Sequence, residues 1–186
     1  LTVREHGLTF RVELCREQHV GLFLDARAAR RVVRQNALGR RVLNLFAYTG
    51  GFGVAAATGG AKSTTNVDWM RSALDLAQAN YALNGLSADT RTFLRNDVFD
   101  HVQRAARGAG RYDLIVLDPP PRCRVRGGGE FWAARDYATF LSKTLQLLAP
   151  DGFVLAGANA EGLDEAALHA ALAAGAARAG RPYAVR

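Results

Sequence analysis

Cysteine is scarce in this chain of 186 residues, which contains only Cys15 and Cys123. No Cys-x-x-Cys pair is present and the histidines lack the spacing of metal ligands, so neither a disulfide framework nor a zinc site is predicted. No apolar run approaches the roughly 20 residues of a membrane span, and no signal-peptide pattern opens the chain. We therefore expect a cytoplasmic protein that contacts no membrane and binds no metal.

Lysine is nearly absent as well, because only Lys62 and Lys143 occur among the 24 basic residues and the rest are arginine. Against 17 acidic residues this gives a formal net charge of +7. Such an excess of arginine arises either from genomic composition or from a polyanionic partner, since a guanidinium pairs with phosphate through two hydrogen bonds. The net charge favours a nucleic-acid partner only modestly, so the positions of the arginines must decide whether such a partner is predicted.

Short apolar runs alternate with helical patterns, which predicts an α/β domain with a mostly parallel sheet. Residues 1–15 alternate around a turn at Glu5-His6-Gly7 and predict a β-hairpin before the main sheet, with Leu8, Phe10, Val12 and Leu14 on one face. Strands are predicted in the run from 42 and at 63–68, 90–94, 112–117 and 153–156, with a sixth beginning at 182–185. Helices are predicted at 25–37, 54–58, 70–84, 97–108, 135–149 and 164–178. We divide the chain into a hairpin with its connection (1–24) and a main domain (25–186).

The central stretch runs from Val42 to Gly53, where an apolar run breaks into glycines before the small residues 54–57. It predicts a buried strand, a tight turn and a helix that packs close to the sheet. A strand–turn–helix unit places backbone N–H groups and a helix N-terminus beside a ligand. We expect a nucleotide-like cofactor at this turn.

Further motifs follow the other predicted strands: Asp68, Asn96-Asp97 and Asp118-Pro119-Pro120. In open parallel sheets, ligands bind outside the carboxyl ends of the strands. Gly51-x-Gly53, with Asp68 lying 17 residues beyond Gly51, fits the dinucleotide fingerprint and leaves a nicotinamide-dependent oxidoreductase as an alternative. Asp118 favours methyl transfer instead, because the prolines fix a rigid turn that can aim an acceptor atom at a methyl donor. A strand-end turn without a role is the other interpretation of Asp118.

Four segments carry a family likeness: Gly21–Arg27, Val42–Phe52, Asp97–Phe99 and Tyr112–Pro120. Together they resemble the class I methyltransferases that modify bacterial large-subunit ribosomal RNA, a group with cytosine-C5 and guanine-N7 enzymes. The segment Gly59–Asp68 is most similar to the guanine-N7 branch. The resemblance covers roughly residues 3–160. It implies a Rossmann-like fold, with a twisted sheet and helices on both faces, and S-adenosylmethionine as cofactor.

The resemblance also implies roles for single residues. Those of the glycine turn would wrap the methionine and ribose portion: Phe46, Tyr48, Thr49, Gly50 and Phe52. Asp68 would hold the ribose hydroxyls, with Trp69 beside the adenine. Asp97 would meet the adenine amino group, Val98 its face, and Asp118 would lie nearest the reacting methyl.

The methyl acceptor follows from what the chain offers for catalysis. Carbon 5 of cytosine needs a thiolate nucleophile, and C5 members carry that cysteine after strand five, where this chain has Ala156 to Ala160. Cys123 is expected to have a lowered pKa between Arg122 and Arg124, but it follows another strand and is either a nucleophile or a loop thiol. Guanine N7 needs mainly positioning and desolvation. Asn159 would then be catalytic at the base edge, or simply fix a turn.

Candidate RNA contacts include Asp25, Arg27, Pro119 and Pro120. Asp25 is also a predicted N-cap. The helix that follows carries Arg27, Arg30, Arg31 and Arg34 on one face, which is either a solvated face or a phosphate-binding one. A second basic segment, with Arg122, Arg124 and Arg126 before Gly127–Gly129, predicts a mobile loop that grips RNA.

We therefore expect an S-adenosylmethionine-dependent methyltransferase acting on an RNA base, guanine-N7-like more than cytosine-C5-like. Relatives place an aromatic ring shortly after Asp-Pro-Pro, where the base stacks. Here Pro121 and Arg122 follow, so the Arg122 guanidinium, Phe131 or Trp132 would have to stack on the base. The missing ring and the missing cysteine leave a second alternative, an RNA-binding module with this fold and no activity.

Overall fold

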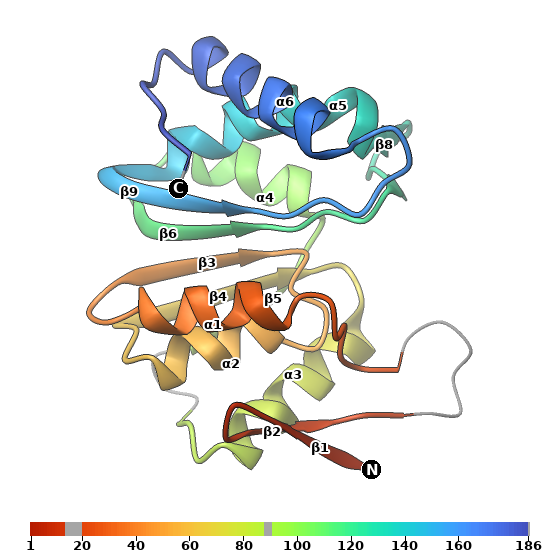
Figure 1. Cartoon of the computed structure of the whole chain (residues 1–186), viewed down its shortest axis with the longest axis vertical. Helices are drawn as coiled ribbons and strands as arrows, with labels where there is room; N and C mark the ends of the chain where they lie inside the picture. Colours follow the sequence, from red (N-terminus) through yellow and green to blue (C-terminus); the bar gives the residue numbers. More distant parts are fainter. Residues whose placement is uncertain (14–19, 88–90, 186) are drawn as a thin grey trace.

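A five-stranded parallel sheet forms the centre of the molecule, which is described here by a computed structural model over residues 1–13, 20–87 and 91–185. The strand order is β5-β4-β3-β6-β9, and all neighbours run parallel (Figure 1). The strands are β3 Arg41–Leu45, β4 Ser63–Asp68, β5 Arg91–Arg95, β6 Tyr112–Leu117 and β9 Leu148–Ala156. The predicted α/β class and parallel sheet are confirmed.

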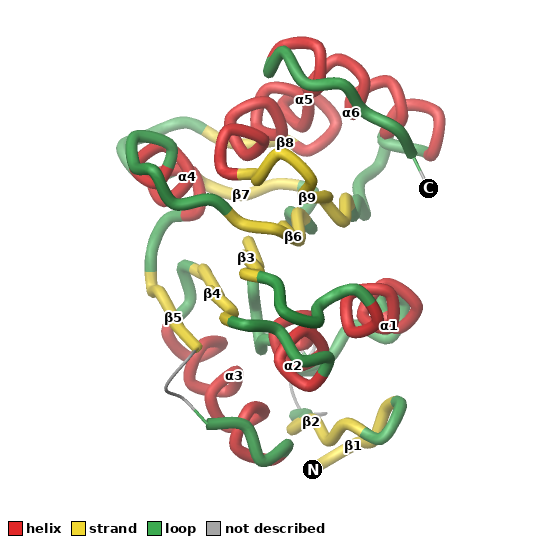
Figure 2. The backbone as a smooth tube through the Cα atoms, turned by 90° about the vertical axis from the view of Figure 1, so that its left-hand side faces the viewer, coloured by secondary structure: helices red, strands yellow, loops and turns green. Residues whose placement is uncertain are grey.

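Helices cover both faces of this sheet (Figures 1 and 2). One face carries α1 Arg27–Gln35, α2 Gly51–Thr58 and α3 Arg71–Leu83, and the other carries α4 Val98–Ala105, α5 Ala133–Thr144 and α6 Glu165–Arg178. Val42 packs with Val33 of α1, whereas its neighbour Leu43 belongs to the opposite cluster with Tyr137 of α5. Both sheet faces are therefore apolar, as in parallel sheets covered on both sides. Among the described helices, none combines the length and apolarity needed to cross a membrane.

The N-terminal hairpin is a separate antiparallel pair, β1 Thr2–Glu5 and β2 Leu8–Arg11. Leu8, Phe10 and Val12 are buried, which confirms its predicted inner face. Leu14, Cys15 and His19 lie outside the described residues. Asparagines near the end of α3 hold the hairpin, since the Thr9 and Arg11 N–H groups donate to the side-chain oxygens of Asn84 and Asn80.

The structure departs from the prediction in two places near the C-terminus. The helix expected at 135–149 ends at Thr144, a 3-10 turn covers Leu145–Leu147, and β9 begins at Leu148. The apolar residues 145–148 fit a helix or a strand equally well. Pro150 lies in β9, the outermost strand, near an irregularity in its register, and its missing N–H is tolerated there. Residues 182–185, expected to begin a strand, have no regular structure.

Helix caps follow the prediction at two helices and depart from it at the third. Asp97 Oδ1 accepts from the N–H groups of Phe99 and Asp100, and Asp164 Oδ1 accepts from Ala167. Asp25 is not an N-cap, because α1 begins at Arg27 and its cap position is Ala26. Asp25 instead lines the cleft at the carboxyl edge of the sheet, which is described below.

The expected basic loop is an ordered hairpin. Its strands are β7 Arg122–Arg124 and β8 Glu130–Trp132, paired antiparallel with Cys123 opposite Phe131. The three glycines 127–129 all have positive φ, at 88°, 108° and 93°, so they form its tip.

Candidate cofactor cleft and active site

The turn after β3 holds an unusual backbone. Phe46 has φ of 56° and Tyr48 of 47°, a region that side chains rarely adopt, and Gly50 follows with φ of 75°. Such conformations persist only where the surroundings fix them. Here the Tyr48 N–H donates to Asp68 Oδ2 at 2.8 Å, and the Gly21 N–H donates to the Tyr48 hydroxyl at 3.0 Å. The turn is thus fastened to β4 and to the connection before α1.

The glycines beyond the turn allow close packing. A Cβ on Gly53 would lie 2.2 Å from Asn66 Oδ1 and 2.5 Å from the Tyr81 hydroxyl, so α2 sits directly against the polar side chains of β4 and α3. A Cβ on Gly50 would lie 2.8 Å from the Cβ of Ala77. The glycine at position 53 is therefore explained by packing and does not require a dinucleotide.

Two carboxylates stand at neighbouring strand ends, as predicted. Asp68 accepts from the N–H groups of Tyr48 and Met70, and burial raises its pKa. Asp97 is buried, and its Oδ2 accepts from the Arg126 N–H at 2.9 Å while Oδ1 caps α4. A carboxylate accepts about four hydrogen bonds, so both acids keep capacity for donors on a ligand.

Asp118 follows β6 on the other side of the turn. Burial raises the pKa of its carboxyl, nearby Asp25 raises it further, and Arg30 opposes the shift. A Cβ on Gly157, just after β9, would lie 2.3 Å from Asp118 Oδ1. The glycine therefore provides the space in which this carboxyl sits, and the Tyr137 hydroxyl fastens the two strand exits by donating to the Gly157 carbonyl oxygen.

These residues line one end of a cavity of about 1,830 Å³, which begins at the carboxyl edge of the sheet and continues along the outermost strand β9. The part at the carboxyl edge is the cleft described here. The cleft brings together most of the residues predicted for the site: Asp25, Phe46, Tyr48, Thr49, Phe52, Asp68, Trp69, Asp97, Val98, Asp118, Pro119, Pro120, Arg124, Arg126 and Asn159. Gly50, Arg27 and Arg122 are not part of its lining.

A family model described as S-adenosylmethionine-dependent methyltransferase matches residues 1–179. The chain belongs to this methyltransferase family. S-adenosylmethionine is the cofactor of the family. The cleft suits such a molecule, because the Asp68 and Asp97 carboxylates keep acceptor capacity for hydroxyl and amino donors on a ligand. The nicotinamide-dependent alternative is thereby contradicted.

The methyltransferase domain is similar to two curated proteins and to a solved structure. It is 40% identical over 153 residues to ribosomal RNA large subunit methyltransferase K of Neisseria meningitidis serogroup B, covering 82% of this chain and 43% of the relative. It is 38% identical over 177 residues to large subunit methyltransferase I of Aeromonas salmonicida, covering 95% and 44%. The structure of SMU.776 in complex with SAH aligns with a TM-score of 0.89 at 33% identity, covering 94% and 46%. The chain thus spans less than half the length of each of these relatives.

The rings near the methyltransferase cleft form a cluster of Phe46, Phe99, Phe131 and Phe140, with Phe99 and Phe140 centroids 4.7 Å apart. Phe131 is only 3% exposed, so the expectation that it could stack on a base is wrong. Trp132 is 42% exposed but is not part of the cleft lining, and Arg122 lies over its ring at 4.4 Å. Arg122 also donates to both oxygens of Glu130 at 2.7 Å, so its guanidinium is held on the outer face of the hairpin.

Cys123 is a weaker acid than the sequence suggested. Burial, together with the nearby Asp97 carboxylate, raises the pKa of its thiol to about 11. The predicted lowering by Arg122 and Arg124 is wrong because side chains alternate along β7, which turns the arginines to the opposite face from the cysteine. Cys123 is therefore a poor nucleophile at neutral pH.

Phe23 and Arg30 are among the lining residues that were not assigned to the site from the sequence. Phe23 is 49% exposed and its ring centroid lies 5.3 Å from that of Tyr48. Its position just before α1 was an available signal. Arg30 also lines the cleft. It is only 3% exposed because it turns inward to pair with buried Glu5. No local pattern reveals that partner, which lies 25 residues away in the sequence.

Proposed function

We propose that this domain transfers the methyl group of S-adenosylmethionine to a base of large-subunit ribosomal RNA. The observation that carries the proposal is the position of Asp118, half-buried before Pro119 in the same cleft as the cofactor-binding turn. The names of the relatives from Neisseria meningitidis and Aeromonas salmonicida support the substrate. The excess of arginine agrees with a polyanionic partner.

In this proposal the bound cofactor supplies an electrophilic methyl group. Asp68 orients the cofactor through its ribose and Asp97 through its adenine, with Val98 against the ring. Phe46, Tyr48, Thr49, Gly50 and Phe52 enclose its methionine portion, and Trp69 covers the adenine. The buried Asp118 carboxyl lies at the methyl end, where Pro119 and Pro120 keep its turn rigid.

Guanine N7 is the acceptor that these side chains suit best. Its lone pair is free and no proton must leave, but the base gains a positive charge on methylation. A carboxylate at Asp118, in a partly water-excluded cleft, stabilises that charge, and the exposed Asn159 at the cleft rim contacts the base edge. The raised pKa of Cys123 and the absence of cysteine from residues 156–160 argue against carbon 5 of cytosine.

The partner and setting follow from the same proposal. RNA is the partner, contacted by Asp25, Arg27, Arg122, Arg124 and Arg126 around the cleft, and the cytoplasm is the location. Within the described residues, no three His, Cys, Asp or Glu side chains gather as a metal site. We further propose that residues 1–24 form a hairpin and connection that serve the methyltransferase domain of residues 25–186.

An RNA-binding module without activity is the second candidate, favoured by the burial of Phe131 and the outward position of Arg122. Calorimetry with S-adenosylmethionine, followed by transfer of labelled methyl to large-subunit ribosomal RNA, separates the two. Binding and transfer, with transfer lost in Asp118→Ala, support the enzyme. Cofactor or RNA binding without transfer supports the silent module.

A further inference from the structure

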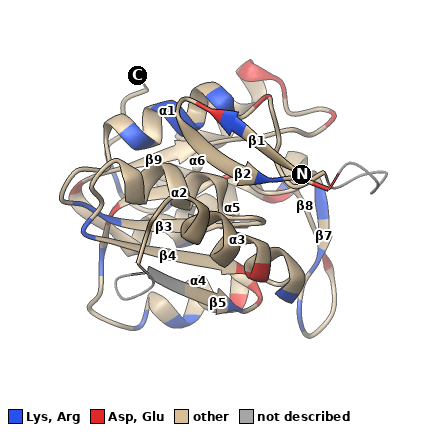
Figure 3. Ribbon diagram, turned by 90° about the horizontal axis from the view of Figure 1, so that it is seen from below, with Lys and Arg blue, Asp and Glu red and all other residues tan. Residues whose placement is uncertain are grey.

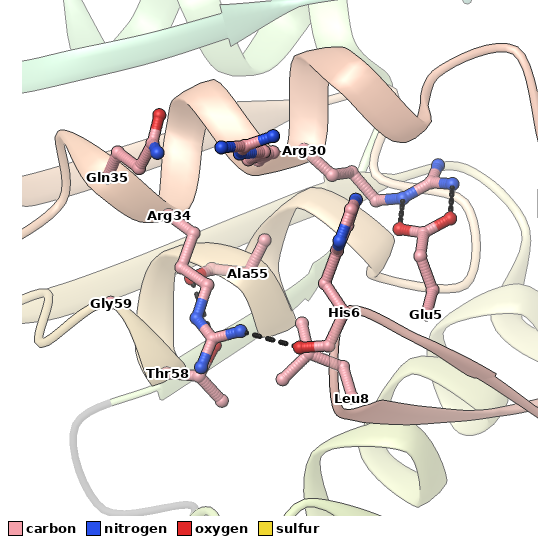
Figure 4. Close-up of a pocket in the computed structure, with 10 residues that line it drawn as sticks. Glu5, His6, Leu8, Arg30, Arg34, Gln35, Ala55, Thr58 and Gly59 are labelled. Atoms are coloured by element: carbon pink, nitrogen blue, oxygen red, sulfur yellow. Dashed lines mark hydrogen bonds and ion pairs between the residues drawn. The ribbon is translucent and has the colours of Figure 1, made fainter.

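A second cavity of about 410 Å³ lies between the hairpin turn and α1, apart from the predicted site residues (Figure 4). The hairpin contributes Glu5 and His6, and α1 contributes Arg30, Arg31 and Arg34. Figure 3 shows the same concentration of basic residues on α1 beside β1. The cavity therefore has an apolar floor on α2 and a basic wall on α1.

The charge of this cavity is unbalanced. Glu5 is the only acid among its described lining residues, and it is fully engaged by Arg30, whose Nε and Nη2 donate to the two carboxylate oxygens at 2.8 and 2.7 Å. Both members of this pair are buried. Arg31 and Arg34 consequently have no carboxylate in the lining to neutralise them.

Two guanidinium groups around the turn, those of Arg34 and Arg27, are held in place before any ligand arrives. Arg34 Nη1 donates to the His6 carbonyl oxygen at 2.9 Å, and Arg27 Nε donates to His6 Nε2 at 3.2 Å. A guanidinium has five N–H donors, so each of these bonds leaves donors for an anion. Fixing the arginines in advance reduces the entropy lost on binding.

The arrangement also corrects the predicted arginine face of this helix. Arg30 turns inward to Glu5, whereas Arg27, Arg31 and Arg34 stay toward solvent. From Arg27 to Arg34 the helix rises about 10 Å, which matches about three steps of a stacked nucleic-acid strand at roughly 3.4 Å per step.

The cavity adjoins the methyl-transfer cleft at Arg30. Arg30 lines both cavities, and Asp25, just before α1, lies close enough to Asp118 to raise its pKa. An RNA strand whose base enters the cleft can therefore follow α1 toward the hairpin. We propose that this cavity binds a backbone phosphate of the RNA substrate, an inference that rests on the proposed function. Arg31 and Arg34 would be the ligands of this phosphate site, and Arg27 would contact a neighbouring phosphate.

The test measures binding of a large-subunit ribosomal RNA fragment as a function of salt. Arg31→Ala with Arg34→Ala removes two proposed contacts, and Arg104→Ala with Arg107→Ala is the matched control on exposed arginines at the end of α4, on the other face of the sheet. Each lost single-strand phosphate contact lowers the slope of log K against log salt by about 0.7. We expect a slope smaller by about 1.4 and RNA binding about 10- to 30-fold weaker at 0.1 M salt, with unchanged affinity for S-adenosylmethionine.

Further outcomes decide the inference. Arg31→Lys with Arg34→Lys should keep most of the slope, and thermal melts of all variants check folding. Equal salt slopes in the test pair and the control pair would contradict the phosphate site. The site would also be contradicted as an RNA contact if the cavity bound inorganic phosphate tightly while RNA binding was the same in the test pair and the unmodified chain. If the unmodified chain neither binds nor methylates RNA, the proposed function itself fails. If it does both and only the slopes agree, the failure is confined to this cavity.

Discussion

Asp118 is half-buried in the cleft, so its protonation affects the stability of the fold as well as its proposed role. Because burial raises its pKa in the folded state above that of the unfolded chain, ionisation costs stability as pH rises through that window. We expect Asp118→Asn to abolish most methyl transfer and to raise Tm at pH 7, by about 2–4 °C for each kcal/mol gained. Well below pH 3.8, where the carboxyl is protonated in both the folded and the unfolded chain, this pH-dependent gain should vanish.

Thermal melts of the Asp118→Asn variant and the unmodified chain from pH 3.5 to 7 measure this difference. A Tm difference that does not grow with pH would mean that the Asp118 carboxyl is not buried as described.

Gly157 provides a second test of the same carboxyl. Its added Cβ would lie 2.3 Å from Asp118 Oδ1, so Gly157→Ala must displace that side chain. Since misplacing a reacting group by about 1 Å costs up to about 100-fold, we expect kcat to fall at least tenfold while cofactor affinity changes little. Gly110→Ala is the control, because a Cβ there meets nothing within 4 Å. Equal kcat in both variants would contradict the proposed role of Asp118.

Cys123 tests the choice of acceptor. With a thiol pKa of about 11, only about one molecule in 10,000 carries the thiolate at pH 7. We expect Cys123→Ser to keep methyl transfer within about twofold, measured with labelled cofactor. A loss of several hundredfold would instead assign Cys123 as the nucleophile of a C5 reaction.

At the scale of single residues, the positions of the cleft aspartates were predicted from the sequence. Each lies at or just after the end of a strand, and parallel strands end at the same edge of the sheet. Asp68, Asp97 and Asp118 all line the cleft. The orientations of Arg30 and Arg122 were predicted wrongly for a different reason. The inward position of Arg30 depends on Glu5 in a distant hairpin, and the outward position of Arg122 depends on Trp132 across a β-hairpin. Neither partner can be identified from spacing along one element.

A buried ion pair, Glu5 with Arg30, joins the N-terminal hairpin to α1 in addition to the two hydrogen bonds at His6. Glu5→Ala leaves Arg30 buried without its partner, which typically costs about 3–5 kcal/mol. We therefore expect a clear drop in the urea midpoint for Glu5→Ala, and much less for the exposed Glu161→Ala. The double variant Glu5→Leu with Arg30→Met should recover most of the loss, because apolar pairs often replace buried ion pairs at no cost. Equal midpoints for Glu5→Ala and Glu161→Ala would exclude a structural role for the pair.

Element boundaries were predictable where turn chemistry marks them. Asp97 and Asp164 cap their helices as expected, and Gly50 of the predicted tight turn stands at the start of α2. The end of α5 was missed because the apolar run through Leu148 has no breaker before Pro150. A proline at this position predicts the end of a helix, but Pro150 is accommodated in the outermost strand of the sheet.

At the scale of the whole molecule, strand–helix alternation predicted two helical layers around a parallel sheet, and both are present (Figure 2). Because every strand ends at the same edge, the turn after β3, the acids after β4 and β5, and Asp118 after β6 share one cleft. The cavity between the hairpin and α1 was not predictable, since it forms only where a separate two-stranded sheet meets the helical layer.

The central claim is that this cleft passes a methyl group from S-adenosylmethionine to an RNA base. The most direct measurement incubates the chain with isotopically labelled cofactor and unmodified large-subunit ribosomal RNA, then identifies the labelled nucleosides by mass spectrometry. The account predicts label on a base, at guanine N7, and none with the Asp118→Ala variant. Label on ribose, or no labelled nucleoside from a chain that binds the cofactor, would contradict it.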